Sequence, residues 1–193
     1  MAGLSNYCEE NSINYICGID YPSPPTLYIG LNSTDDDDGG GEVTDTYLSG
    51  RASYTGLGFT SPATVTGFRQ IKNSTLVTLG TAIAVGTVPY FTIWDASTGG
   101  NCLWIGAFIN ALGVEEALSF GIGDELSIAI NGLKINLSLA ETSIYLRDIE
   151  LNWIKGTTAP TAPTTYAGLA TAVDPNGTVT EVTSAVRGRS EEH

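Results

Sequence analysis

Acidic side chains form the densest group in this sequence that could do chemistry. Four consecutive aspartates, Asp35 to Asp38, precede three glycines, Gly39 to Gly41. Hard cations such as Ca²⁺ prefer clustered carboxylates, so this run could hold one. The ligand spacing of a calcium-binding loop is absent, however, and runs of like charge usually form solvated loops. We therefore favour a solvated loop and expect no cofactor and no metal.

Two further acidic pairs could support glycoside hydrolysis, which needs two facing carboxyl groups. These are Glu115 with Glu116, and Asp124 with Glu125. Adjacent acids at the ends of strands usually face water. The sequence has no Gly-x-Ser-x-Gly motif, no phosphate-binding loop and no zinc spacing, and its one histidine is His193. We predict that the protein is not an enzyme.

The three tryptophans, Trp94, Trp104 and Trp153, could form a platform that stacks on sugars. Two of them lie in the most apolar segments of the chain, and buried packing is the commoner use of tryptophan. We therefore favour core and interface packing over sugar binding.

The charge balance excludes some partners. The chain has 193 residues, only 8 Lys and Arg, and a net charge of -13. Contacts to phosphates require basic side chains, so we expect neither nucleic acid nor an anionic membrane as a partner. No targeting segment and no membrane helix are visible, which favours synthesis in a host cytoplasm. Cys8, Cys17 and Cys102 lack metal spacing and are expected to be reduced, buried thiols.

The elements that position these residues are mainly strands. Residues 125–130 and 133–139 alternate between apolar and polar, and Asn131-Gly132 between them is the preferred pair for a two-residue hairpin turn. In that hairpin Ile130 would face Leu133. A second hairpin is expected from residues 88–94 and 102–108, which are apolar on both faces and should lie centrally.

Further strands are expected at residues 26–31, 51–59, 67–72 and 76–79. Strands at such short intervals predict a mainly β fold, an antiparallel β-sandwich or barrel-like domain. The chain begins differently, because Leu4, Tyr7, Cys8, Tyr15 and Ile16 follow one side of a helix, which the prolines from Pro22 onward end.

The start of the chain recurs near its end, at a shift of 138 residues. The matched pairs are Ser5 and Ser143, Tyr7 and Tyr145, Asn14 and Asn152, Ile16 and Ile154, Gly18 and Gly156, Pro22 and Pro160, Tyr28 and Tyr166, Gly30 and Gly168, and Leu31 and Leu169. Trp153 matches Tyr15. After a one-residue slip, Glu42-Val43-Thr44 matches Glu181-Val182-Thr183.

This repeat divides the chain into two parts. Residues 1–140 form a β-rich domain with an N-terminal helix, and residues 141–193 form an incomplete second copy that has nothing matching the strands from residue 67 to residue 139. So short a fragment buries too little surface to be stable alone. We predict a helix-and-strand arm that packs on a neighbouring subunit. Its interface residues would be Trp153, Ile154, Tyr166, Gly168, Leu169 and Val182. The alternative is a segment folded back on its own domain.

Several motifs resemble one family of small phage virion proteins. They are Leu4-Ser5-Asn6-Tyr7, then Pro24-Pro25-Thr26-Leu27-Tyr28-Ile29-Gly30-Leu31, then Gly41-Glu42-Val43, and the hairpin from Phe91 to Trp104 with Asp95-Ala96-Ser97-Thr98-Gly99-Gly100-Asn101 at its turn. Tyr47 and Arg51 approximate a further motif. The family is commonly labelled "phage tail fiber protein". The resemblance covers residues 4–139 and implies a β-sandwich-like virion component without an activity.

Two functions follow as hypotheses. The first is a capsid decoration or cement protein on the outer surface of the virion, which binds the major capsid protein and other copies of itself, with a trimer suspected. Its compact size and negative charge favour this hypothesis. The alternative is a tail-fibre or tail-tip protein that binds a host surface glycan.

Overall fold

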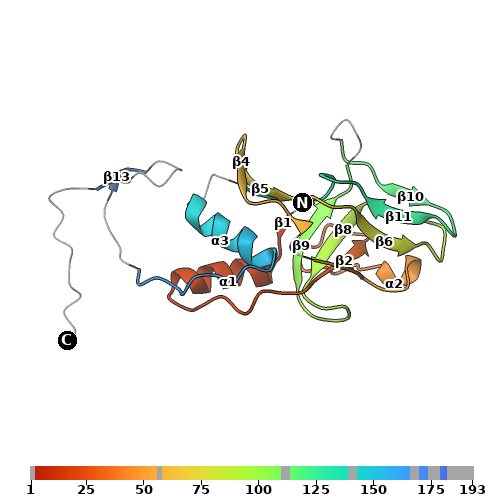
Figure 1. Cartoon of the computed structure of the whole chain (residues 1–193), viewed down its shortest axis with the longest axis horizontal. Helices are drawn as coiled ribbons and strands as arrows, with labels where there is room; N and C mark the ends of the chain where they lie inside the picture. Colours follow the sequence, from red (N-terminus) through yellow and green to blue (C-terminus); the bar gives the residue numbers. More distant parts are fainter. Residues whose placement is uncertain are drawn as a thin grey trace.

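The protein is mainly β, with antiparallel sheets that form the body and two helices at one end (Figure 1). The computed structural model describes residues 3–55, 58–109, 114–138, 143–165, 170–173 and 179–181. The predicted fold class, an antiparallel sandwich-like β domain with an N-terminal helix, is confirmed.

The largest sheet has five strands in the order β1-β9-β8-β2-β3. Their bounds are Gly3–Leu4 for β1, Cys102–Ala107 for β9, Tyr90–Trp94 for β8, Leu27–Asn32 for β2 and Ala52–Tyr54 for β3. The predicted hairpin of residues 88–94 and 102–108 is confirmed as β8 and β9. As its apolar faces indicated, it lies centrally and is almost entirely buried.

Smaller sheets complete the body. They are β12-β5-β4 (Lys134–Ser138, Phe68–Lys72, Ala63–Val65), β11-β6 (Glu125–Ile128, Val77–Thr81) and β10-β7 (Leu118–Phe120, Gly86–Val88). A further pair joins β13 (Ala170–Val173) to β14 (Val179–Glu181). The helices are α1 (Asn6–Ile16), the one-turn α2 (Thr44–Tyr47) and α3 (Ile144–Ile154).

The predicted hairpin at Asn131-Gly132 is wrong. A different turn forms one residue earlier, with Ile130 and Asn131 at its centre: Asn131 has a φ of 64°, and the amide of Gly132 donates to the carbonyl of Ala129. The strands beside it separate, however, because β11 pairs with β6 and β12 pairs with β5. Leu133 is fully buried, but its expected partner Ile130 is 56% exposed.

The side chain and backbone of Asn73 explain this separation. The backbone of Asn73 donates to the carbonyl of Leu133 and accepts from the amide of Asn131, at 3.1 and 2.9 Å. Its side chain accepts from the amide of Leu133 and donates to the carbonyl of Ala129, at 2.9 and 2.8 Å. Asn73 thus takes the hydrogen bonds that the second hairpin strand would have made, and the two strands enter different sheets.

The repeat seen in the sequence is also a repeat of structure, since α1 and α3 begin and end exactly 138 residues apart. Ser5 and Ser143 cap them in the same way, each hydroxyl accepting from the amide three residues later. Both helices end at a glycine with positive φ, 89° at Gly18 and 90° at Gly156. The predicted helix at the start of the chain is therefore confirmed, although Ile16 is 47% exposed and does not lie on the buried side.

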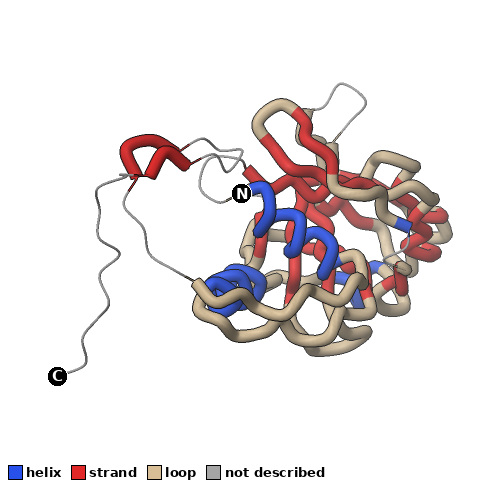
Figure 2. The backbone as a smooth tube through the Cα atoms, turned by 60° about the vertical axis from the view of Figure 1, so that its left-hand side comes forward, coloured by secondary structure: helices blue, strands red, loops and turns tan. Residues whose placement is uncertain are grey.

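The two helices cross at one end of the body (Figure 2) and contact each other through equivalent residues. Ser12 donates to Glu150, its counterpart in the second copy. Tyr7 packs against Trp153 with ring centroids 6.4 Å apart. The reciprocal contact joins Tyr145, the counterpart of Tyr7, to Tyr15, the counterpart of Trp153. Burial and the hydrogen bond with Tyr145 raise the pKa of Tyr15 to about 12.

The segment that follows each helix contacts the other helix, again in a reciprocal way. The indole Nε1 of Trp153 donates to the carbonyl of Pro22 at 2.8 Å, and the hydroxyl of Tyr15 donates to the carbonyl of Thr161 at 3.4 Å. Because each contact has its counterpart, an approximate two-fold relation connects the two helices with their proline-rich connectors.

Candidate functional site

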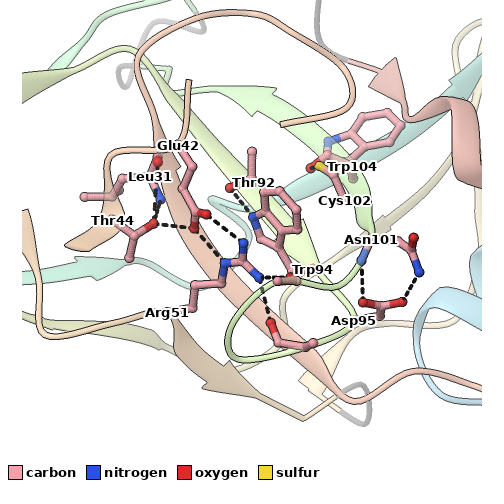
Figure 3. Close-up of polar contacts among 12 residues, drawn as sticks. Leu31, Glu42, Thr44, Arg51, Thr92, Trp94, Asp95, Asn101, Cys102 and Trp104 are labelled. Carbon is pink, nitrogen blue, oxygen red and sulfur yellow. Dashed lines mark hydrogen bonds and ion pairs between the residues drawn. The ribbon is translucent and has the colours of Figure 1, made fainter. Parts of the chain in front are cut away.

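Arg51, just before β3, is the centre of a buried polar cluster shown in Figure 3. Its guanidinium binds the carboxylate of Glu42 through two hydrogen bonds of 2.6 Å. The side chain of Arg51 is only 5% exposed. Such bidentate pairs are among the stronger and geometrically most specific polar contacts.

The same guanidinium fixes the loop between β8 and β9. Its Nη1 donates to the carbonyls of Ala96 and Gly99, at 2.8 and 2.7 Å. Its plane lies over the ring of Trp94, 3.6 Å from the centroid. We call Arg51, Glu42, Trp94 and the hydroxyls of Thr44 and Thr92 the Arg51 clamp.

A second set of bonds closes the loop at its base. The carboxylate of Asp95 accepts from the backbone amide and from the side-chain amide of Asn101, both at 2.7 Å. Residues 97–101 are exposed. The loop is therefore an exposed surface that buried side chains hold in one conformation.

Strand β2 contributes Gly30 because no side chain would fit there. A Cβ at this position would lie 2.8 Å from the hydroxyl of Thr44 and 2.9 Å from the carboxylate of Glu42. That hydroxyl accepts from the amide of Leu31 and donates to Glu42. Burial alone would raise the pKa of Glu42, but the hydrogen bonds from Arg51 and Thr44 and the charge of Arg51 outweigh it and lower that pKa.

The bonds of this cluster stabilise the conformation of the chain itself. Arg51 directs its hydrogen bonds to a carboxylate and two carbonyls of its own chain. The residues of the motifs that resemble the fibre family, Glu42, Arg51, Asp95 and Asn101, thus hold a loop in place.

All three tryptophans are buried, at 7% exposure for Trp94, 4% for Trp104 and 2% for Trp153. Trp94 stacks under Arg51, and Trp153 packs on Tyr7 and Tyr21. Packing in the core is confirmed, and these side chains present no sugar-stacking platform.

The aspartate run positions α1. The carboxylate of Asp38 accepts from the backbone amide and the side-chain amide of Asn6, at 3.1 and 2.7 Å. Asp36 accepts from the amide of Asp38. Within the described part of the chain, no three His, Cys, Asp or Glu side chains are grouped to hold a metal ion.

The acidic pairs are exposed. Asp124 accepts from the amide of Gly121, and Glu125 accepts from the hydroxyl of Thr81. These contacts stabilise turns and strand ends.

The thiols do not all match the expectation. Cys8 and Cys102 are buried, and burial raises the pKa of both, to about 12 for Cys102. Cys17, at the end of α1, is exposed, so the prediction that all three are buried is wrong for this residue.

The predicted arm interface stays a prediction, and two of its residues lie in the described part of the chain. Trp153 and Ile154 are 2% and 0% exposed and belong to the core that the β body and both helices share. Their own chain covers them here, as in the alternative of a segment folded back on its own domain, and an interface with a neighbouring subunit stays a prediction. Tyr166, Gly168, Leu169 and Val182, the other residues of the predicted interface, lie outside the described residues.

Sequence reasoning did not find the clamp as a unit or the role of Asn73. The spacing of Glu42 and Arg51 within a family-like motif was the available signal, but it does not show that both residues reach a loop some fifty residues later. Asn73 follows a strand like many turn residues, so it carries no signal of its own.

The comparisons with known proteins agree with the motifs. No helix among the described residues is long and apolar enough to cross a membrane, and no curated protein matches the chain. A family model described as "Podophage GP4 fiber I protein gp80" matches residues 3–136, more than two thirds of the sequence. The match runs from β1 into β12 and includes the whole Arg51 clamp, and the chain belongs to this family of phage fibre proteins.

Proposed function

We propose that the chain is a non-enzymatic structural subunit of a bacteriophage tail fibre. Membership of the fibre family makes it a virion component. The family match carries the fibre part of the proposal. The Arg51 clamp supports the non-enzymatic part, because the polar residues of the family-like motifs hold the chain's own loop instead of lining a reactive cleft.

The family description favours the tail-fibre alternative over the capsid-decoration hypothesis. Small size and a net charge of -13, which motivated the decoration hypothesis, are compatible with any exposed virion protein. A host glycan would need a surface other than the three tryptophans, since all three are buried. Association with other copies, including a trimer, stays a prediction.

Fractionation of purified virions tests the proposal. Heads and tails are separated after mild disruption, and the chain is quantified in each fraction by mass spectrometry against the major capsid protein. We expect the chain in the tail fraction at a small copy number. Recovery with empty heads, in a fixed ratio to the major capsid protein, would overturn the proposal in favour of decoration.

A further inference from the structure

Equivalent positions in the two copies of the helix differ sharply in burial. Leu151 and Ile154 of α3 are fully buried, whereas their counterparts in α1, Ile13 and Ile16, are 61% and 47% exposed. The helices have the same length, the same caps and reciprocal contacts, so the difference comes from what covers them.

The β body covers α3. Asp148 accepts from Arg69 of β5 through two bonds of 2.7 Å, and the Nζ of Lys155 donates to the carbonyl of Thr60 at 3.3 Å. Leu151 lies on the same helical face as Asp148 and Lys155, three positions after one and four before the other. We call the part of the body that α3 covers, with Arg69 at its centre, the β5 surface.

The same face of α1 is open. Its residues Glu10, Ile13 and Ile16 are the counterparts of Asp148, Leu151 and Ile154, and all three are exposed. Helix α1 therefore carries a carboxylate and two aliphatic side chains at the same spacing as those with which α3 contacts the β body. We call these three residues the outer face of α1.

The approximate two-fold relation between α1 and α3 indicates which surface fits the outer face of α1. It exchanges α1 with α3, so it also places a second β5 surface against the outer face of α1. The exposure of Tyr145 on α3 supports the same placement of a second β body. Tyr145 is 58% exposed, whereas its counterpart Tyr7 is partly buried against the core.

We propose that the outer face of α1 docks a second β domain of this family, through the surface that β5 and Arg69 form here. In an intact copy of this chain α3 already covers that surface. The partner is therefore a family domain with an open β5 surface, one without a helix equivalent to α3, and in the two-fold arrangement α3 of this chain takes the place of that domain's own first helix. The family match ends at residue 136, before α3 begins, so α3 is no part of the matched unit. A basic side chain of the partner, at the place of Arg69, would pair with Glu10.

The proposal goes beyond the fibre assignment, since it stands on the helix pair and is independent of the place of the protein in the virion.

A full-length variant serves as the probe partner. Leu151→Asp with Ile154→Asp displaces α3 and opens the β5 surface, and Ile13→Asp prevents the probe from binding itself. The labelled probe is mixed with the full-length wild-type chain and followed by sedimentation velocity. We expect a one-to-one complex at micromolar concentration. Absence of any complex with a folded probe would overturn the proposal.

Matched variants of the unlabelled chain locate the contact. Ile13→Asp should weaken binding by about tenfold or more, because it places a charge in an apolar contact. Ile122→Asp is the control, since Ile122 is 71% exposed and lies in the turn after β10, a strand at the end of the body opposite the two helices (Figure 1). Equal binding by both variants would contradict the proposed face.

Charge reversal gives a test that non-specific association cannot imitate. Glu10→Arg should abolish binding, and Arg69→Glu in the probe should restore it. If the probe does not fold, as judged by near-ultraviolet circular dichroism, Arg69→Glu without the two α3 substitutions serves as the probe, because the substituted carboxylate repels Asp148 and opens the surface. Failure of the reversed pair to bind would refute the assigned partner surface.

Discussion

Ser12 and Glu150, which occupy the same position in two copies of one helix, are bonded to each other across the approximate two-fold relation of the helix pair. Both are buried, and the hydroxyl of Ser12 also contacts that of Tyr21 at 2.7 Å. Burial raises the pKa of Glu150 to about 7, against the opposing effects of Ser12 and Arg147, with Glu9 adding to the rise. A carboxyl group thus lies at the centre of the contact that joins the two halves.

Glu150→Gln should remove a pH dependence of stability. The folded state favours the protonated carboxyl, so its full stabilisation is present below the unfolded pKa of 4.5 and is lost as pH rises to about 7. For a shift of this size the loss is about 3 kcal/mol. Urea unfolding at pH 5 and pH 8 should show this loss in the wild-type chain and not in the variant.

The comparison between variants isolates Glu150, because other carboxyl groups such as Glu42, whose pKa is lowered, change stability in the opposite direction. Glu10→Gln is the matched control, since Glu10 lies on the exposed face of the same helix system. Identical pH profiles for wild type and Glu150→Gln would refute the role of this carboxyl group.

Arg51→Lys should destabilise the protein by about 2–4 kcal/mol, because an ammonium group cannot replace the paired bonds to Glu42 and the bonds to two loop carbonyls. The amides of Gly99 and Gly100 should then exchange faster with solvent than those of β8. Denaturant unfolding and hydrogen exchange measure the two effects. A double-mutant cycle with Glu42→Gln should give a coupling above about 1 kcal/mol, and additive effects would show that the clamp does not act as a unit.

Asn73→Ala should cost about 2–4 kcal/mol, because it leaves the amide of Leu133 and the carbonyl of Ala129 without their side-chain partner in a buried place. Asn136→Ala is the control, since it removes one partly buried bond to Gln70 and should cost about 1 kcal/mol or less. Thermal unfolding of both variants measures the two losses of stability. Similar losses would mean that Asn73 does not hold the two strands apart.

Trp153→Ala should destabilise the chain by about 3–5 kcal/mol, since the indole packs on Tyr7 and Tyr21 and donates to Pro22. The loss should be independent of protein concentration, because every one of these contacts lies within one chain. A midpoint of unfolding that rises with concentration would instead indicate contacts between chains.

Several patterns that depend on local spacing were read correctly from the sequence. The apolar hairpin of β8 and β9, the helix after Ser5 and the repeat of that helix after Ser143 all follow from residues close in the chain. The pairing of β11 and β12 could not be read in this way, because Asn73, some sixty residues away, decides it. The Arg51 clamp likewise depends on three separated segments.

The sequence allows two packing arrangements for Trp153 and Ile154, and its composition does not distinguish them. An apolar helix without its own sheet can pack on a neighbouring subunit or on its own chain. Asp148 and Arg69 carry complementary charges, but only the folded body brings them together and gives α3 its place.

Hydrogen exchange of the full-length chain tests most directly the claim that α3 completes its own chain's core as the counterpart of α1. The measurement is made at a concentration at which sedimentation shows a monomer. We predict that the amides from Arg147 to Lys155 exchange as slowly as those of α1 and do not depend on concentration. Rapid exchange of α3 in the monomer, with protection that appears only on association, would contradict the account.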